Sequence, residues 1–493
     1  MKVRHVSITA LVGILVGCGG AVPAAEAAPS PAATTPPAKA SAASRISPRD
    51  RVYTANQTSN TVSVIDPSAP GGGKLLGEIV LGAARTEVLS PIYRGQLNVH
   101  GLGFSPDHKT LVVVSIGSNS VTFIDTATNA VKGTAYIGRA PHEAFFTPDG
   151  REVWATVRGE NYVSVIDAQT FKETSRIAVA DGPGMTLFRP DGRVAFVVSS
   201  FTAELDVIDV ATKAVIAKVP VASPFSPDLF VSNDGREVWM THKDVGKVTV
   251  VDAITFKVKT VIDTGPITNH VALLDTARGK LAFVTVGGLN AVKVFSRDDA
   301  PKLLATIPTG ALPHGLWPSP DQTRVYVGLE NGDAVIDANT WKEITRVPIG
   351  QAPQALVYVP DAVADGAGTA NLKPLGETQR PIEIGLQPAA PAKGGGLVVL
   401  RAFALVDTVD VNIFGLEPDR RWTLALDNGA PQPVTLAVFA TNGKGGGAAQ
   451  VTGPVRRSGA FDASSPRSRA AKLLVLADGA PSGSAPRLEG ALP

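Results

Sequence analysis

The feature that most constrains the fold of this chain is a repeated five-residue motif, in which apolar residues alternate with small or polar ones and aspartate comes last. It first reads Val62-Ser63-Val64-Ile65-Asp66. It returns at 121–125, 163–167, 205–209 and 248–252, and in weaker form at 292–296 and 333–337. Successive last positions are 59, 42, 42, 43, 44 and 41 residues apart. So regular a period, built on β-branched residues with strand-type alternation, is typical of a β-propeller with four strands in each blade.

The two ends of the repeated array complement each other. Each full period holds four strand signals separated by polar turns, which we name A to D from the axis outward. The first repeat, residues 51–82, has B, C and D signals without an A strand before them. Residues 353–360 form an A signal without B, C and D after it. The sequence therefore predicts seven blades, closed by a C-terminal strand that pairs with N-terminal ones, so that no edge is left open.

The repeats resemble the YVTN-type, or YncE-like, β-propeller family. The resemblance lies in Val52-Tyr53-Thr54-Ala55-Asn56 and Ser59-Asn60-Thr61-Val62-Ser63-Val64-Ile65-Asp66, and it covers residues 51–361. It implies the propeller fold. It does not select an activity, because the family includes binding and surface proteins and its sequence relatives include lactonases and haem d1 domains.

The N-terminus indicates export. Lys2, Arg4 and His5 precede an apolar stretch from Val6 to Val16, which suits a secretory signal and is too short to span a bilayer. We therefore expect a protein of the periplasm or outer surface.

The only cysteine, Cys18, ends the motif Leu15-Val16-Gly17-Cys18, which resembles the lipobox of bacterial lipoproteins. In that family this cysteine carries the lipid anchor. The alternative is an ordinary signal peptide, cut near Ala25-Glu26-Ala27. We expect residues 1–18 to be a signal peptide with a lipobox, residues 19–48 to be a disordered tether rich in Ala, Pro, Ser and Thr, and the membrane to be reached only through the lipid.

The remaining chain divides into two expected domains. Residues 49–361 are assigned to the propeller and 362–380, rich in Ala, Gly and Asp, to a linker. From 381 to 493 the period is absent, and short strand signals alternate with turns such as Asp427-Asn428-Gly429. This pattern predicts a small antiparallel β-sandwich-like domain, so the expected fold class is all-β.

The start of each A strand faces the mouth of the central channel in a propeller, and the B-to-C turns lie on the same face. In register, the A-strand starts are His100, His142, Gly184, Ser226, His270, His314 and Gln354. Turn residues on this face include Asn56, Arg158, Glu160, His242, Lys243, Glu330 and Asn331. The long connection from Ala83 to Asn98 adds Arg85 and Tyr93. Together they predict a ligand site at the channel mouth.

Four of the seven histidines in the chain fall on one arc of this ring: His100, His142, His270 and His314. Imidazoles from adjacent blades are suitable ligands for zinc, copper or haem iron. The other interpretation is structural, in which each ring bonds to neighbouring backbone. No cofactor is assigned from the sequence, and a metal ion or haem stays open.

Several function classes are disfavoured. The chain has no Cys-x-x-Cys-His motif, which excludes covalent c-type haem, and its net charge of +2 gives no pull toward nucleic acid. No catalytic residues are assigned. The leading hypothesis is a cell-envelope module that binds an unidentified envelope protein or small ligand. A metal- or haem-dependent redox protein is the alternative, and a lactonase is the third option.

Overall fold

The computed structural model describes residues 45–82, 97–376, 381–389, 393–403, 406–453, 455, 471–481 and 483–492. The regular secondary structure of this part of the chain is nearly all β-strand, with a short 3-10 helix, η2 (Gly287–Leu289). In the described ranges no helix has the length and apolar character needed to cross a membrane. The expected signal peptide with Cys18, and most of the expected tether, lie outside these ranges.

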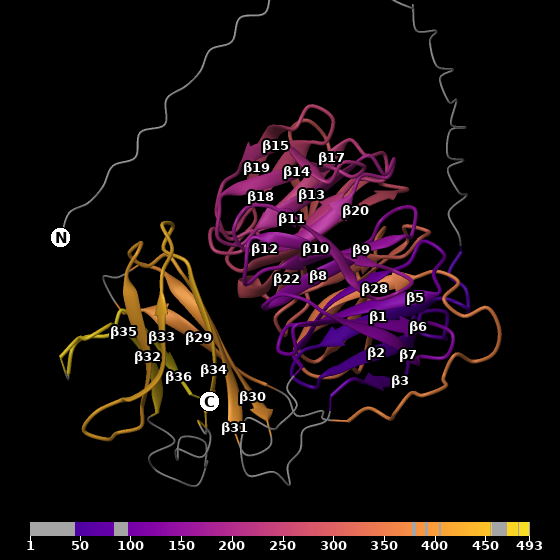
Figure 1. The fold of residues 1–493 in the computed structure, drawn as a ribbon. Helices are drawn as coiled ribbons and strands as arrows, with labels where there is room; N and C mark the ends of the chain where they lie inside the picture. Colours follow the sequence, from indigo (N-terminus) through magenta and orange to yellow (C-terminus); the bar gives the residue numbers. More distant parts are fainter. Residues whose placement is uncertain are drawn as a thin grey trace, which may run out of the picture. The chain divides into compact units, whose positions relative to one another are not determined.

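Seven four-stranded antiparallel sheets form the blades of a propeller, which confirms the predicted fold (Figure 1). From the inner to the outer strand, blade 1 consists of β28 (Pro353–Val359), β1 (Arg51–Asn56), β2 (Thr61–Asp66) and β3 (Lys74–Val80). In the same order, blade 2 consists of β4 (Val99–Phe104), β5 (Thr110–Ser115), β6 (Ser120–Asp125) and β7 (Val131–Tyr136). Blade 3 consists of β8 (Pro141–Phe146), β9 (Glu152–Val157), β10 (Tyr162–Asp167) and β11 (Glu173–Ala178). Blade 4 consists of β12 (Pro183–Phe188), β13 (Val194–Ser199), β14 (Glu204–Asp209) and β15 (Ala214–Pro220). Blade 5 consists of β16 (Leu229–Val231), β17 (Glu237–His242), β18 (Lys247–Asp252) and β19 (Lys257–Asp263). Blade 6 consists of β20 (Thr268–Thr276), β21 (Gly279–Val286), β22 (Ala291–Ser296) and β23 (Leu303–Pro308). Blade 7 consists of β24 (Leu316–Pro318), β25 (Arg324–Leu329), β26 (Gly332–Asp337) and β27 (Glu343–Val347).

The ring is closed as the sequence predicts. Strand β28 pairs antiparallel with β1, so that Leu356 lies opposite Thr54 and Val359 opposite Arg51. The inner strands contact one another around a full circle, in the order β28, β4, β8, β12, β16, β20, β24 and back to β28. The first blade is therefore shared between the two ends of the propeller sequence.

The aspartate that ends the repeated five-residue motif closes the turn that follows the strand. Asp167 accepts hydrogen bonds from the backbone N–H of Thr170, at 2.7 Å, and from its hydroxyl, at 2.8 Å. These bonds close the turn after the strand and hold the pKa of Asp167 below its usual value. Equivalent Asp-to-Thr bonds follow β6, β14 and β18. The repeat thus encodes both a buried strand and the turn that ends it.

The C-terminal strands form a second β unit, which confirms the predicted antiparallel β domain; its strands form a single sheet that is close to a barrel. Its eight strands are β29 (Ile382–Pro388), β30 (Gly395–Phe403), β31 (Val406–Phe414), β32 (Arg421–Asp427), β33 (Val434–Ala440), β34 (Gly447–Gly453), β35 (Lys472–Ala477) and β36 (Leu488–Ala491). They pair antiparallel in one continuous order, and the two end strands, β33 and β34, contact each other. The sheet therefore curls around its own apolar core, which includes Trp422, Leu424 and Val398.

Candidate ligand-binding site at the channel mouth

Aromatic side chains fill the channel beneath its mouth. Trp317 on β24 lies 5.3 Å from the ring of Phe230 and 6.4 Å from the rings of both Phe104 and Phe145, measured between ring centroids. These phenylalanines come from three other inner strands, and each lies three or four residues beyond the start of its A segment. The packed rings form an apolar floor, so a ligand entering at the mouth meets a closed end.

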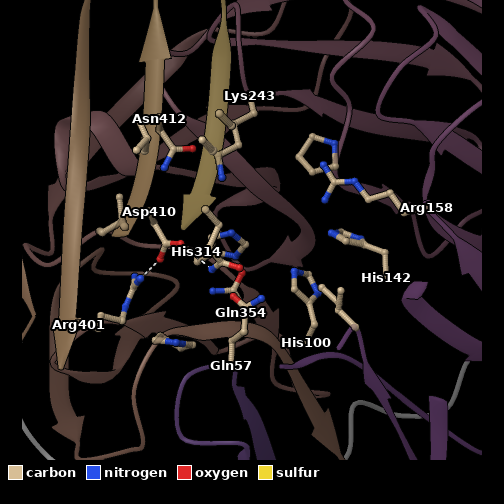
Figure 2. A pocket seen from close by; sticks show the side chains of 18 of the residues that line it. Gln57, His100, His142, Arg158, Lys243, His314, Gln354, Arg401, Asp410 and Asn412 are labelled. Atoms are coloured by element: carbon tan, nitrogen blue, oxygen red, sulfur yellow. Dashed lines mark hydrogen bonds and ion pairs between the residues drawn. The ribbon is translucent and has the colours of Figure 1, made fainter. Parts of the chain in front are cut away.

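A cavity of about 340 Å³ lies above this floor. Its walls include residues from A-strand starts, namely His100, His142, His314 and Gln354 (Figure 2). They also include Gln57, Ile116, Arg158, Lys243 and Glu330, which lie at or just beyond the ends of B strands. The structure therefore brings A-strand starts and B-to-C turns together at one pocket, and the volume is within the range of small-molecule sites.

The four predicted arc histidines form two pairs. The rings of His100 and His142 have centroids 4.1 Å apart, and those of His270 and His314 have centroids 4.8 Å apart. Each pair includes a carboxyl group: Glu143 Oε1 lies 3.4 Å from His100 Nδ1. Asp228 Oδ1 lies 3.2 Å from His270 Nδ1. The channel thus contains two separate clusters of two imidazoles and one carboxyl group.

Burial favours the neutral forms of the groups in these clusters. Burial, with smaller contributions from nearby groups that include Lys243, lowers the pKa of His100 and of His270 to about 3. The pKa values of His142 and His314 are also held well below the usual value, chiefly by burial. Burial raises the pKa of Glu143 to about 8. The imidazoles are therefore neutral and the Glu143 carboxyl is mostly protonated.

The fold fixes the inner strands, and with them the rings, through bonds that cross from blade to blade. His142 Nδ1 lies 2.8 Å from the carbonyl oxygen of Gly184, the equivalent position in the next blade. The same carbonyl accepts the hydroxyl of Thr156, also at 2.8 Å. Thr285 and Thr241 make the corresponding bonds, to His314 O at 2.7 Å and Asn269 O at 2.8 Å. A threonine in the B strand therefore ties adjacent A segments together in three blades.

Two cations face the pocket without an anionic partner. Arg158 follows β9 and Lys243 follows β17, and the side chain of neither forms a hydrogen bond or ion pair with any residue that the structure describes. The Arg158 guanidinium lies 5.3 Å from the centre of the Phe225 ring, which holds it by a cation–π contact. Burial lowers the pKa of Arg158 to about 10, and burial together with Arg158 and Arg401 lowers that of Lys243 to about 8. Both groups are charged at pH 7.

Strands of the C-terminal unit line the other side of this pocket. Arg401 on β30 forms an ion pair with Asp410 on β31 (Figure 2). It also forms an ion pair with Glu330 of the propeller. The wall is completed by Val411, Asn412, Ala448, Ala449 and Gln450. Arg401 and Glu330 satisfy each other, whereas Arg158 and Lys243 remain available to a ligand.

Other predicted site residues have different surroundings. The Glu160 carboxylate accepts the backbone N–H of Arg139 at 2.8 Å and does not line the pocket. His242 is fully buried between the hydroxyls of Ser226, at 2.9 Å, and Thr249, at 2.6 Å. His270 lines a smaller cavity deeper in the channel. Arg85 and Tyr93 lie outside the described residues.

Glu143 and Asp228 were missed by the sequence reasoning, although a signal was present. Each is an acidic residue in or next to an inner segment whose other residues are mostly apolar, in Pro141-His142-Glu143-Ala144 and in Pro227-Asp228-Leu229. A carboxyl group at such a position faces a channel or a neighbouring strand rather than solvent. Reading the register one or two residues further would have found both.

Comparison with known proteins indicates the fold alone. No protein-family model and no curated protein matches the chain. Among solved structures, hydrazine synthase from Kuenenia stuttgartiensis is similar with a TM-score of 0.50 and 22% identity, over 54% of this chain and 91% of that one. A protein from Desulfotomaculum acetoxidans whose title calls it functionally unknown is similar with a TM-score of 0.51 and 12% identity, over 62% of this chain and 99% of that one.

Proposed function

We propose that this protein is a binding module that holds a small organic anion, a carboxylate or phosphate, at the mouth of its propeller channel. The observation that carries the proposal is a pair of cations on one pocket, Arg158 and Lys243, whose side chains have no anionic partner among the described residues. A cation that loses water without gaining a counter-ion raises the free energy of the fold. An anion bound between the two groups offsets that cost.

The remaining walls suit the rest of such a ligand. Phe225, Leu312 and Ile116 provide apolar surface for a carbon skeleton. The neutral imidazoles of His100 and His142, and other polar groups in the wall, offer hydrogen bonds without adding charge. The pocket therefore combines apolar walls with a few convergent polar groups, as small-molecule sites do.

The cellular setting in this proposal is the envelope of a bacterium. The signal-like N-terminus and the lipobox-like Leu15-Val16-Gly17-Cys18 support export and lipid anchoring, and the repeats support membership of the YVTN-type propellers. Membrane fractionation of cells expressing the wild type or Cys18→Ala tests the anchor. Loss of the protein from membranes in the variant is expected, and equal membrane retention of the two would overturn this part.

Binding is tested by isothermal titration of purified, chelator-treated protein with malonate, and with malonamide as a neutral analogue of the same shape. Malonate is expected to bind and malonamide to bind at least about tenfold more weakly, since only malonate pairs with the cations. Arg158→Gln and Lys243→Gln are each expected to weaken malonate binding by about tenfold or more.

The matched control is Lys257→Gln, which removes an exposed lysine from β19 of the same blade as Lys243. It is expected to leave the affinity for malonate unchanged. Phosphate and acetate, titrated in parallel, separate a phosphate site from a carboxylate site. Absence of binding by malonate, acetate and phosphate, or equal binding by wild type and the Arg158→Gln, Lys243→Gln double variant, contradicts the proposed function.

A further inference from the structure

The cluster at the start of β8 has the composition of a metal site. Among the described residues, His100, His142 and Glu143 form the one group of three or more potential ligands whose ligand atoms all lie within 4.8 Å of one another. Two histidines and one carboxylate are a ligand set found in zinc and non-haem iron sites. The distance of 3.4 Å from His100 Nδ1 to Glu143 Oε1 already matches the separation of about 3.3 Å between two ligands of a tetrahedral zinc ion with bonds of about 2.0 Å.

The atoms facing each other in this cluster lack other partners. His100 is 5% exposed and Glu143 is 2% exposed. His100 Nδ1 and Glu143 Oε1 are both buried without a hydrogen-bond partner among the described residues. Unpaired buried polar atoms are costly, because they lose water without a replacement. Two such atoms 3.4 Å apart provide a candidate place for a metal ion that both can bind.

The outer contacts orient the ligands as metal sites require. The bond from His142 Nδ1 to Gly184 O places the proton on Nδ1, which leaves the lone pair of Nε2 free. Glu143 Oε2 accepts the backbone N–H of Leu102 at 3.2 Å, which leaves Oε1 free. The backbone around the cluster is also closely packed, since a Cβ at Gly101 would lie 2.3 Å from His142 O. These contacts hold two of the three ligand groups in fixed orientations.

We propose that His100, His142 and Glu143 bind a divalent first-row metal ion, with zinc as the reference ion, and leave one coordination position open to the channel-mouth cavity. His100 and His142 line that cavity, while Glu143 lines the space below, so the ion would lie between them. Three protein ligands with an open position are typical of reactive rather than structural zinc sites. The nearby charges of Arg158 and Lys243 disfavour a bare cation, so we expect the ion to bind more tightly together with an anion. This last expectation rests on the proposed function.

The second cluster provides a matched comparison in the same channel. Asp228 and His270 are as deeply buried as Glu143 and His100, and their closest atoms are 3.2 Å apart. Their ligand atoms do not form a group of three within the same limit among the residues described. A substitution there therefore changes an equally buried carboxyl group without touching the proposed ligands.

The test is titration of full-length, metal-free protein with Co²⁺, followed by visible absorption, and with Zn²⁺ in competition with a chromophoric chelator. Wild type is expected to bind one equivalent and to develop cobalt ligand-field bands. Glu143→Gln, which keeps the shape and the acceptor for Leu102, is expected to weaken binding at least about 100-fold. Asp228→Asn is expected to bind as wild type does. If Glu143→Gln unfolds, His100→Gln gives the same comparison, with thermal unfolding as the check on folding.

The proposal is overturned if wild type binds neither Co²⁺ nor Zn²⁺ at one equivalent. It is also overturned if Glu143→Gln binds the metal ion as tightly as wild type does. A larger loss in Asp228→Asn than in Glu143→Gln would contradict it as well, because it would assign the ion to the other cluster. These measurements contain no malonate, and the malonate titrations use protein from which metal ions have been removed by chelator treatment. Failure of the metal site is thus distinct from failure of the anion site. Repeating the Zn²⁺ titration with malonate, with a correction for the Zn²⁺ that malonate binds in solution, tests the coupling: tighter binding supports it, and unchanged or weaker binding contradicts it.

Discussion

The charge on Lys243 gives the anion site a specific pH dependence. Burial, with Arg158 and Arg401 nearby, lowers the pKa of Lys243 to about 8. About nine-tenths of the side chains are charged at pH 7 and about one-tenth at pH 9. If only the charged form holds the anion, the affinity for malonate falls about tenfold over this range, or about 1.4 kcal/mol. The groups that share this environment are Arg158, Arg401, His100, His270 and His314.

The matched variant is Lys243→Arg, whose guanidinium remains protonated throughout this range. Its malonate affinity is expected to be nearly constant from pH 7 to pH 9, apart from any contribution of Glu143. The pKa of Glu143, which burial raises to about 8, falls in the same window, but Glu143 is present in both proteins. The difference in pH dependence of malonate affinity between the two proteins is therefore due to the titration of Lys243.

Isothermal titration at pH 7, 8 and 9 measures both profiles, since malonate is fully ionised at each. The reasoning is refuted if the wild-type affinity stays constant while the protein remains folded. It is equally refuted if Lys243→Arg loses affinity as steeply as wild type does.

Three further predictions concern the scaffold. Burial raises the pKa of Asp333 to about 7, so the native state keeps its proton while the unfolded chain releases it between about pH 4 and 7; wild type should lose about 4 kcal/mol of stability across that window relative to Asp333→Asn, and parallel urea-unfolding profiles of the two would contradict this. Gly103→Ala places a Cβ 2.2 Å from Ala144 O and is expected to cost about 1–3 kcal/mol by urea unfolding, while Gly453→Ala, with nothing within 4 Å, is the control whose equal cost would refute the steric argument. Tyr358→Phe removes the 2.6 Å bond from the ring hydroxyl to Asp50 and is expected to cost about 1–3 kcal/mol in the same assay, with an unchanged midpoint as the contrary result.

The fold was predictable because the sequence features that determine it are local and recur in each period. Each period carries a buried strand, its closing aspartate and a polar turn, so strand order followed from counting. The closure followed from the missing A strand before Arg51 and the extra one at 353–360, and the pairing of Thr54 with Leu356 confirms it. Strand β36 (Leu488–Ala491) was not predicted, because four residues with a glycine and a glutamate carry no strand-type alternation.

The site was only partly predictable. Register identified His100, His142, His270 and His314, but it gave no distances across the channel, so the division into two pairs was not foreseen. The partner of each turn residue depends on which blade faces it in space. Glu330 is paired with Arg401 from a strand 71 positions away, whereas Lys243 is left unpaired, and no spacing in the sequence distinguishes these outcomes.

A crystal structure of the protein grown with malonate tests the proposed anion site most directly. We predict electron density for one malonate in the channel-mouth cavity, with carboxylate oxygens within salt-bridge distance of both Arg158 and Lys243. Density for water alone in that cavity, or a malonate bound elsewhere with both cations turned to other partners, would contradict it.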